Sequence, residues 1–325
     1  MATGKNRRNR AKKKPREKRM SAKSAGTATV SGKSSRYGAD TVPVPPGLRL
    51  IEAGMSQTRS KASSARKGAA SAADRLALLR RAQDIMYDAW ESGDMRERIA
   101  MAKKALAVSD LCADAWIDVA YETSDIVEAR ELYERAAAAG KEAVELELGP
   151  GAFADYAGDF WRILPTRPYM RAVAGLSDLM WDMGEREESI ALIREMLRLN
   201  PNDNQGMRSY LISKLFALDD LSEVENLLEI YREPDFAEWH WNMALLTFRR
   251  EGDSADAASI LDQAIEVNPF VPKLLTGATP VPVSMPPQYS LGSPEEAISY
   301  AFLNGKNWSD TKGALTWVAR KTKGK

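Results

Sequence analysis

Two pairs of turn residues lie 68 positions apart in this 325-residue chain. Gly184 and Gly252 form one pair, and the Asn-Pro steps that begin at Asn200 and Asn268 form the other. Between such breaks, from about Ala72 onward, apolar residues recur at helical spacing, and no alternating strand pattern of useful length appears. Because 68 is twice 34, this spacing predicts a repeated helix–turn–helix unit of about 34 residues.

A 34-residue helical pair is the period of the tetratricopeptide repeat (TPR). The repeat that ends at Pro269 fits the TPR pattern, and so does the repeat two units earlier, which ends at Pro201. In both, small residues such as Ser177 and Ala257 stand where two helices approach closely, because a large side chain there would overpack the contact. Three further repeats are degenerate. We therefore predict an all-α chain that forms a TPR-type helical-repeat solenoid of about five partly degenerate repeats.

Composition divides the chain into three predicted parts. Residues 1–70 form a basic arm, which we expect to be disordered because it has too little apolar surface to offset backbone ordering. Residues 71–275 form the TPR-like repeat domain, with an irregular, aromatic-rich insertion at about 140–168. Residues 276–325 hold a Pro-rich segment, C-terminal capping helices and a short basic tail. A Ser-Pro-Glu-Glu motif from residue 293 predicts the start of the first capping helix.

The formal net charge of +1 hides two regions of opposite charge. Residues 1–68 contain 18 lysines and arginines against three acids, a net of +15, and residues 69–325 have a net of −14. A basic polyelectrolyte binds phosphate groups, so nucleic acid or ribosome binding is the alternative to a solubilising tail. Tyr37 is its one aromatic residue, which argues against base-specific RNA recognition. The candidate polyanion-binding residues of the arm are Arg7, Arg8, Arg10, Lys12, Lys13, Lys14, Arg16, Lys18 and Arg19.

One cysteine and one histidine exclude an internal disulfide framework and His-rich metal or catalytic clusters. Cys112 lies between apolar residues without an activating base, and His240 has no His or Cys partner, so both are predicted to be structural. We predict no catalytic residue, no cofactor and no metal site, and hence no enzyme. No apolar run approaches the roughly 18–20 residues that span a bilayer. The expected location is therefore cytoplasmic, or nuclear for a eukaryotic source.

TPR solenoids bind peptides or partner helices on a concave face lined by the first helix of each repeat. Tyr, Trp and Arg, the residue types enriched at binding hot spots, recur at those positions. The leading prediction is a non-enzymatic protein–protein interaction scaffold whose groove takes a partly acidic peptide or helix. The alternative for Trp181 and Trp239 is that they pack neighbouring repeats together. The candidate groove residues are Tyr87, Trp90, Tyr121, Arg171, Asp178, Trp181, Arg208, Trp239, Asn242 and Arg249.

Several segments are more specific than a generic repeat predicts. Those near the C-terminus are Val267–Leu275, Gly292–Phe302, Trp308 and Gly313–Leu315. They resemble the C-terminal signature of the suppressor of tumorigenicity protein 7 family. Arg167–Arg171 and Met196–Asn204 look like the bacterial TPR branch of that family. The resemblance covers roughly 150–318 and implies an α-helical repeat protein without an assigned catalytic activity. Eukaryotic members carry N-terminal membrane segments, whereas this chain has a basic arm.

Overall fold

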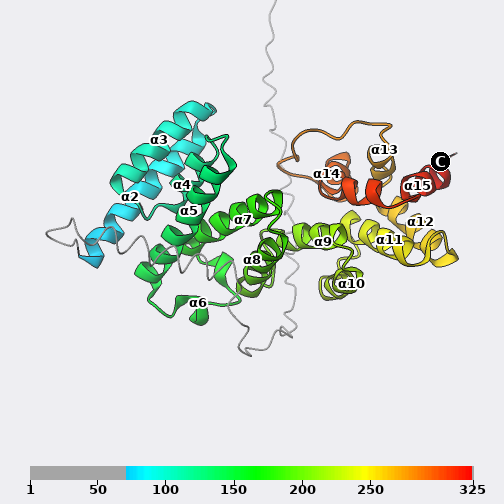
Figure 1. Ribbon diagram of the computed structural model, residues 1–325, viewed down its shortest axis with the longest axis horizontal. Helices are drawn as coiled ribbons and strands as arrows, with labels where there is room; N and C mark the ends of the chain where they lie inside the picture. Colours follow the sequence, from blue (N-terminus) through cyan, green and yellow to red (C-terminus); the bar gives the residue numbers. More distant parts are fainter. Residues whose placement is uncertain (1–70, 324–325) are drawn as a thin grey trace, which may run out of the picture. The chain divides into compact units, whose positions relative to one another are not determined.

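The computed structural model describes residues 71–323 and, in this range, contains fourteen α-helices, two short 3₁₀ helices and no β-strand (Figure 1). The predicted all-α class is confirmed. The basic arm and its candidate polyanion-binding residues lie outside the described residues. Within the described residues, no helix is both long enough and apolar enough to cross a membrane.

Most consecutive helices pack against each other in pairs. The five pairs are α2 (Ala72–Glu91) with α3 (Met95–Val108), α4 (Ala113–Ala120) with α5 (Ile126–Leu148), α7 (Arg167–Asp182) with α8 (Arg186–Leu199), α9 (Met207–Ala217) with α10 (Leu221–Ile230), and α11 (Ala237–Glu251) with α12 (Ala255–Val267). Short α6 (Ala152–Asp155), η1 (Phe160–Arg162) and η2 (Leu164–Thr166) lie between α5 and α7. The C-terminal helices are α13 (Val271–Leu275), α14 (Pro294–Asp310) and α15 (Ala314–Thr322).

Local sequence explains where many of these helices begin and end. Six helices begin after a Ser or Asp whose side chain accepts a hydrogen bond from a first-turn backbone N–H, a cap worth about 1 kcal/mol each. These capping residues are Ser71, Asp94, Asp125, Asp220, Ser254 and Ser293. Gly184 and Gly252, the pair that revealed the 68-residue spacing, have φ angles of 87° and 69°. Glycine adopts this region without the penalty that a Cβ brings, which is why it marks both turns.

The insertion between α5 and α7 differs from its predicted extent. Irregular structure was expected from Gly140, but α5 continues through it to Leu148. Gly140 is needed inside the helix because α7 crosses there: a Cβ on Gly140 would lie 2.8 Å from the Cα of Tyr169. Gly175 of α7 is equally constrained, because its Cβ would overlap the ring of Tyr133 in α5. These glycines allow α5 and α7 to pack closely.

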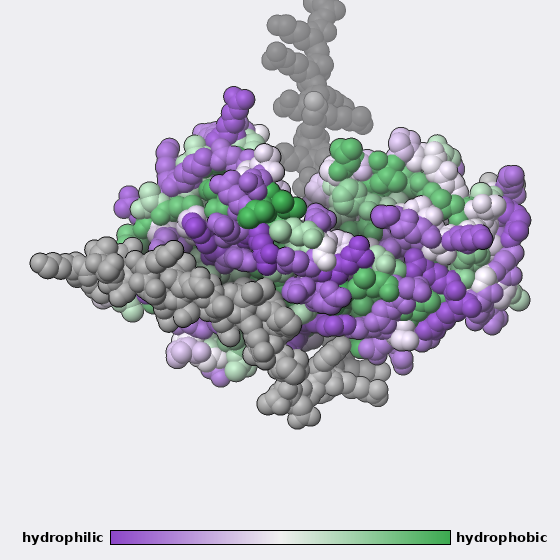
Figure 2. Space-filling view, viewed as in Figure 1, coloured by the Kyte–Doolittle hydropathy of each residue, from purple (hydrophilic) through white to green (hydrophobic). Residues whose placement is uncertain are grey.

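The C-terminal helices complete the core rather than only capping its end. The main hydrophobic cluster extends from Ala120 to Val318 and includes buried residues of α9, α11, α14 and α15. A smaller cluster joins α2, α3 and the start of α4. Helix α14 continues to Asp310 and packs on α9, α11 and α13. Figure 2 shows hydrophobic residues gathered over the connection between α13 and α14, where Val283 and Leu291 are exposed.

Candidate partner-binding face

Side-chain contacts join alternate helices, from α2 through α4 and α7 to α9 and α11. The Asp114 carboxylate of α4 accepts a hydrogen bond from Gln83 of α2 (2.8 Å) and a bidentate pair from Arg171 of α7 (2.8 and 2.6 Å). Lys214 of α9 then lies 3.0 Å from the Asp178 carboxylate of α7. We call the surface that carries these contacts, made by α2, α4, α7, α9 and α11, the first-helix face.

The N-terminal half of the first-helix face, on α2, α4 and α7, exposes aromatic rings. Tyr87 is 51% exposed, Trp90 37% and Tyr121 71%. Tyr87 and Trp90 contact each other edge to face, with ring centroids 5.7 Å apart. The Arg171 guanidinium lies over the Trp90 ring at 5.2 Å while it pairs with Asp114, which is only 1% exposed. Large aromatic side chains on a supported surface are typical of protein-binding hot spots.

At the middle of the face, a lysine is held by a carboxylate and an aromatic ring. Lys214 is buried, and its ammonium group lies 3.0 Å from Asp178 and 4.8 Å from the centre of the Trp181 ring. An ion pair and a cation–π contact together compensate for removing this charge from water. Asp178 itself is half exposed, so its carboxylate still borders the open part of the face.

Helix α14 covers the C-terminal half of the face, on α9 and α11. Ser213 Oγ donates to the Leu303 carbonyl (2.7 Å), and Asn307 Nδ2 donates to the Ser213 carbonyl (3.0 Å). The hydroxyl of Tyr300 donates to Asn242 Oδ1 (3.2 Å). Asn242 is 0% exposed under this helix, so its side chain is not available on the surface.

Buried aromatic residues fix α14 in place. Trp241 of α11, Trp308 of α14 and Trp317 of α15 are all fully buried. The Trp308 ring lies 5.8 Å from that of Trp241 and 6.5 Å from that of Trp317. Its indole N–H donates to the Tyr300 hydroxyl (2.7 Å). At the start of α14, the buried Glu296 carboxylate accepts from the backbone N–H of Ala237 (3.0 Å), the N-terminal residue of α11.

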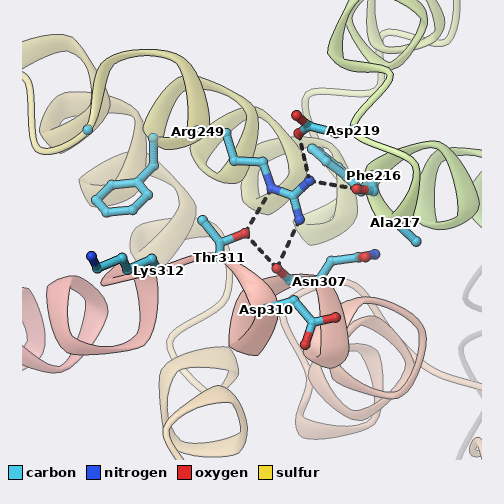
Figure 3. Close-up of a pocket in the computed structure, with 10 residues that line it drawn as sticks. Phe216, Ala217, Asp219, Arg249, Asn307, Asp310, Thr311 and Lys312 are labelled. Atoms are coloured by element: carbon cyan, nitrogen blue, oxygen red, sulfur yellow. Dashed lines mark hydrogen bonds and ion pairs between the residues drawn. The ribbon is translucent and has the colours of Figure 1, made fainter.

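Arg249 closes the far end of this covered half (Figure 3). Its guanidinium donates to Thr311 Oγ1 (2.8 Å), the Phe216 carbonyl (2.6 Å) and the Asn307 carbonyl (3.1 Å). Those carbonyls belong to the last turns of α9 and α14, where the helix dipole is negative. Burial lowers the pKa of Arg249. The hollow beside Arg249, about 510 Å³, is lined by residues of three turns. The Arg249 guanidinium, the cation of this hollow, is already bound by groups of the protein itself.

Comparison with known proteins identifies the family of this chain. The sequence pattern of the family described as "ST7 protein" matches residues 71–324. The chain belongs to the ST7 family. The match reaches from α2 to the C-terminus and so extends well beyond the segment, roughly 150–318, that carried the resemblance.

This ST7-family chain is 29% identical over 272 residues to "Protein ST7 homolog" of Caenorhabditis elegans. The alignment covers 71% of this chain and 49% of that protein. It is 27% identical over 257 residues to the protein of the same name from Drosophila pseudoobscura pseudoobscura (71% and 46%). It is 25% identical over 264 residues to "Suppressor of tumorigenicity 7 protein-like" of Bos taurus (73% and 46%). The matches therefore include slightly less than half of each of these relatives.

The candidate groove residues of the ST7-family chain fall into three groups. Tyr87, Trp90 and Tyr121 are exposed, and Asn242 is buried. The remaining six are partly buried and have partners within the molecule: Arg171, Asp178, Trp181, Arg208, Trp239 and Arg249. The groove prediction itself remains untested by this geometry, but the exposed members lie only in the N-terminal half of the face.

The region around Arg208 is an internal network that sequence reasoning missed. Arg208 pairs with Glu233 (2.5 Å), and its backbone N–H donates to the buried Asp203 carboxylate (2.9 Å). Glu238 accepts from Ser209 Oγ (2.7 Å), and its Oε1 is buried without a hydrogen-bond partner. Burial raises the pKa of both Glu238 and Asp203. A Glu in the first turn of α11 looks like a simple helix-start residue in the sequence, so nothing local signals this burial.

The two residues considered for catalysis have structural partners. Cys112 is 0% exposed, and burial raises the pKa of its thiol to about 12, so the nucleophilic thiolate does not form near neutral pH. A ring nitrogen of His240 lies 2.8 Å from the Pro234 carbonyl. Among residues 71–323, no group of three or more His, Cys, Asp or Glu residues is placed to hold a metal ion.

Proposed function

We propose that this ST7-family chain is a non-enzymatic scaffold that binds a peptide or helix of a partner protein on the N-terminal half of its first-helix face. The observation that supports this most directly lies in the other half. There the same face of α9 and α11 already holds a helix, α14, through side-chain and backbone hydrogen bonds. A surface suited to a helix in one half is open, and aromatic, in the other.

We propose further that the helical pairs form a TPR-type solenoid of the bacterial type within the family. The five consecutive pairs and the glycine turns at Gly184 and Gly252, 68 residues apart, support this assignment. The contact between Ser177 of α7 and Ser189 of α8 supports it as well. Both residues are 0% exposed, and Ser189 Oγ donates to the Ser177 carbonyl (2.6 Å). In such a solenoid the first helices line the binding surface, which is the position of the exposed aromatic rings.

Affinity capture with the full-length chain tests the proposal. The variant Tyr87→Ala/Trp90→Ala/Tyr121→Ala should lose at least tenfold of its captured partner, because hot-spot aromatics each contribute about 1–2 kcal/mol or more. A matched variant, Tyr156→Ala/Leu164→Ala/Ile230→Ala, removes exposed apolar side chains elsewhere and should retain the partner. Equal recovery of the same partner by both variants, with unchanged thermal melting, would contradict the proposal.

A second candidate function rests on the net charge of +15 in residues 1–68. A nucleic-acid- or ribosome-associated factor would bind through that arm, with the repeats secondary. Running the same capture with and without nuclease separates the two functions. Nuclease-sensitive capture that is lost when the nine candidate arm residues become Gln favours the second function, because phosphate binding depends on those charges.

A further inference from the structure

We infer that the partner segment bound by the N-terminal half of the first-helix face is cationic, with Lys or Arg side chains interspersed with apolar ones. This inference rests on the proposed function, since it specifies the partner of that same surface. A cationic partner is the opposite of the partly acidic partner that the sequence analysis predicted. In the structure, Arg171 is already paired with Asp114, and exposed carboxylates border the aromatic rings.

Two arginines of this half of the face, Arg171 and Arg80, are already paired with carboxylates. Arg171 makes a bidentate ion pair with Asp114, and Arg80 of α2 lies 3.0 Å from the Glu147 carboxylate of α5. A bidentate guanidinium–carboxylate pair satisfies both groups in a fixed geometry. An acidic partner would have to break these pairs, and removing Arg171 from Asp114 would leave a buried carboxylate unpaired, which is costly.

Three exposed carboxylates of this half have no ion-pair partner among the described residues. Asp84 and Glu91 stand three residues before and four residues after Tyr87 on α2, so all three side chains share one side of the helix. Asp182 follows Trp181 at the end of α7. All three carboxylates are exposed, and none of them forms an ion pair among the described residues. The open aromatic surface is therefore bordered by negative charge.

The face itself shows how it binds a cation. Lys214 lies between the Asp178 carboxylate and the Trp181 ring, at 3.0 and 4.8 Å. Arg171 lies between Asp114 and the Trp90 ring in the same way, at 2.6 and 5.2 Å. Each site combines a carboxylate with an aromatic ring, and each is filled by a cation from a neighbouring helix. Cation–π contacts of this kind strengthen as the cation is desolvated.

Tyr87 with Asp84 and Glu91 repeats this combination on α2 without an internal cation. In both of those sites the cation comes from a helix that follows in the chain, and α4, the helix of the face that follows α2, contains no Lys or Arg. A partner side chain with a positive charge would fill this place as Lys214 fills the place beside Trp181. The partner's apolar side chains would then cover Trp90 and Tyr121.

The experiment measures binding of two fluorescein-labelled peptides to the full-length chain by anisotropy. One is an amphipathic helix of Leu and Lys, and the other has Glu at every Lys position. The Lys peptide should bind more tightly, and binding should weaken about tenfold in Asp84→Asn/Glu91→Gln/Asp182→Asn. The matched variant Glu229→Gln/Asp256→Asn/Glu266→Gln removes equal exposed charge outside the face and should change binding less than about twofold. A tenfold change corresponds to about 1.4 kcal/mol.

Three results would overturn the inference. Equal weakening by both charge variants would mean that the Lys peptide responds to the net negative charge of residues 69–325 and not to this surface. Tighter binding of the Glu peptide, abolished by Tyr87→Ala/Trp90→Ala/Tyr121→Ala, would reject the cationic partner while leaving the proposed binding face intact. If neither peptide responds to the aromatic variant, both the inference and the proposed face fail.

Discussion

The two halves of the first-helix face are built from the same kind of helical pair, yet they have opposite surfaces. On α9 and α11 the face is closed by α14, and Asn242 is completely buried beneath it. On α2, α4 and α7 it is open, and Tyr121 is 71% exposed. The difference lies in whether the chain supplies a helix to cover the surface. The pairing of helices alone therefore does not decide which half is exposed.

Replacing one tryptophan in each half should give the largest difference in the free energy of unfolding between the two halves. Trp308→Ala removes a fully buried ring that links α14 to α11 and α15, and should cost about 3–5 kcal/mol. Trp90→Ala removes a ring that is 37% exposed and should cost about 1 kcal/mol or less. Urea denaturation of each full-length variant gives both free energies of unfolding. Similar costs for the two variants would show that α14 is not part of the stable core.

Glycine substitutions should change stability in opposite directions in α5, which packs under the open half, and in α14, which covers the other half. Gly140→Ala in α5 should destabilise by about 1–3 kcal/mol, because its Cβ would lie 2.8 Å from the Tyr169 backbone of α7. Gly305→Ala in α14 meets no atom within 4 Å and should stabilise by up to about 1 kcal/mol through helix propensity. Thermal melting checks both. A stabilising Gly140→Ala would refute the close approach of α5 and α7. The expected destabilisation would show that an open surface does not imply loose packing below it.

Glu238→Gln should give a smaller, pH-dependent effect in the covered half. Burial raises the folded-state pKa of Glu238, so the folded chain keeps this proton to a higher pH than the unfolded chain does. The charged carboxylate therefore destabilises the fold as pH rises above the ordinary value of 4.5. The amide should stabilise by about 1 kcal/mol at pH 7, comparable to an unsatisfied buried polar group. This gain should vanish below about pH 4.5 in denaturation curves.

Glu225→Gln serves as the control of opposite sign. The ion pair with Arg250 lowers the pKa of the exposed Glu225. Its charged form therefore favours folding at neutral pH, and that contribution is lost as pH falls through the lowered pKa. A gain in stability at pH 7 from Glu225→Gln as well would indicate a general response to lower negative charge, not the burial of Glu238.

Local sequence predicted the helical class and several boundaries because those depend on nearby residues. The glycine turns at Gly184 and Gly252 and the helix start at Ser293 need only local geometry. The same reasoning failed at Gly140, since a mid-helix glycine looks like a helix end until the crossing helix is known. The predicted disorder of residues 1–70 lies outside the described part of the chain.

The candidate site was harder to predict for a related reason. Helical periodicity placed Tyr87 and Asn242 on equivalent positions of first helices, but one is exposed and the other buried. The contact that separates them joins residues far apart in sequence, as when Asn307 donates to Ser213, 94 positions earlier. A period of 34 residues carries no information about such a contact. A polar stripe at helical spacing on α14, formed by Tyr300, Asn304 and Asn307, was the available signal.

The proline-rich connection at 276–293 gives α14 an advantage that does not depend on its side chains. A helix tethered by a short linker meets its binding surface at an effective concentration on the order of millimolar. A free helix present at about 1 μM would need roughly a thousandfold higher intrinsic affinity to displace it from α9 and α11. Among the described residues, no such tethered helix covers the exposed aromatic side chains of α2 and α4. At that end of the helical pairs, a dilute partner therefore meets no tethered competitor from residues 71–323.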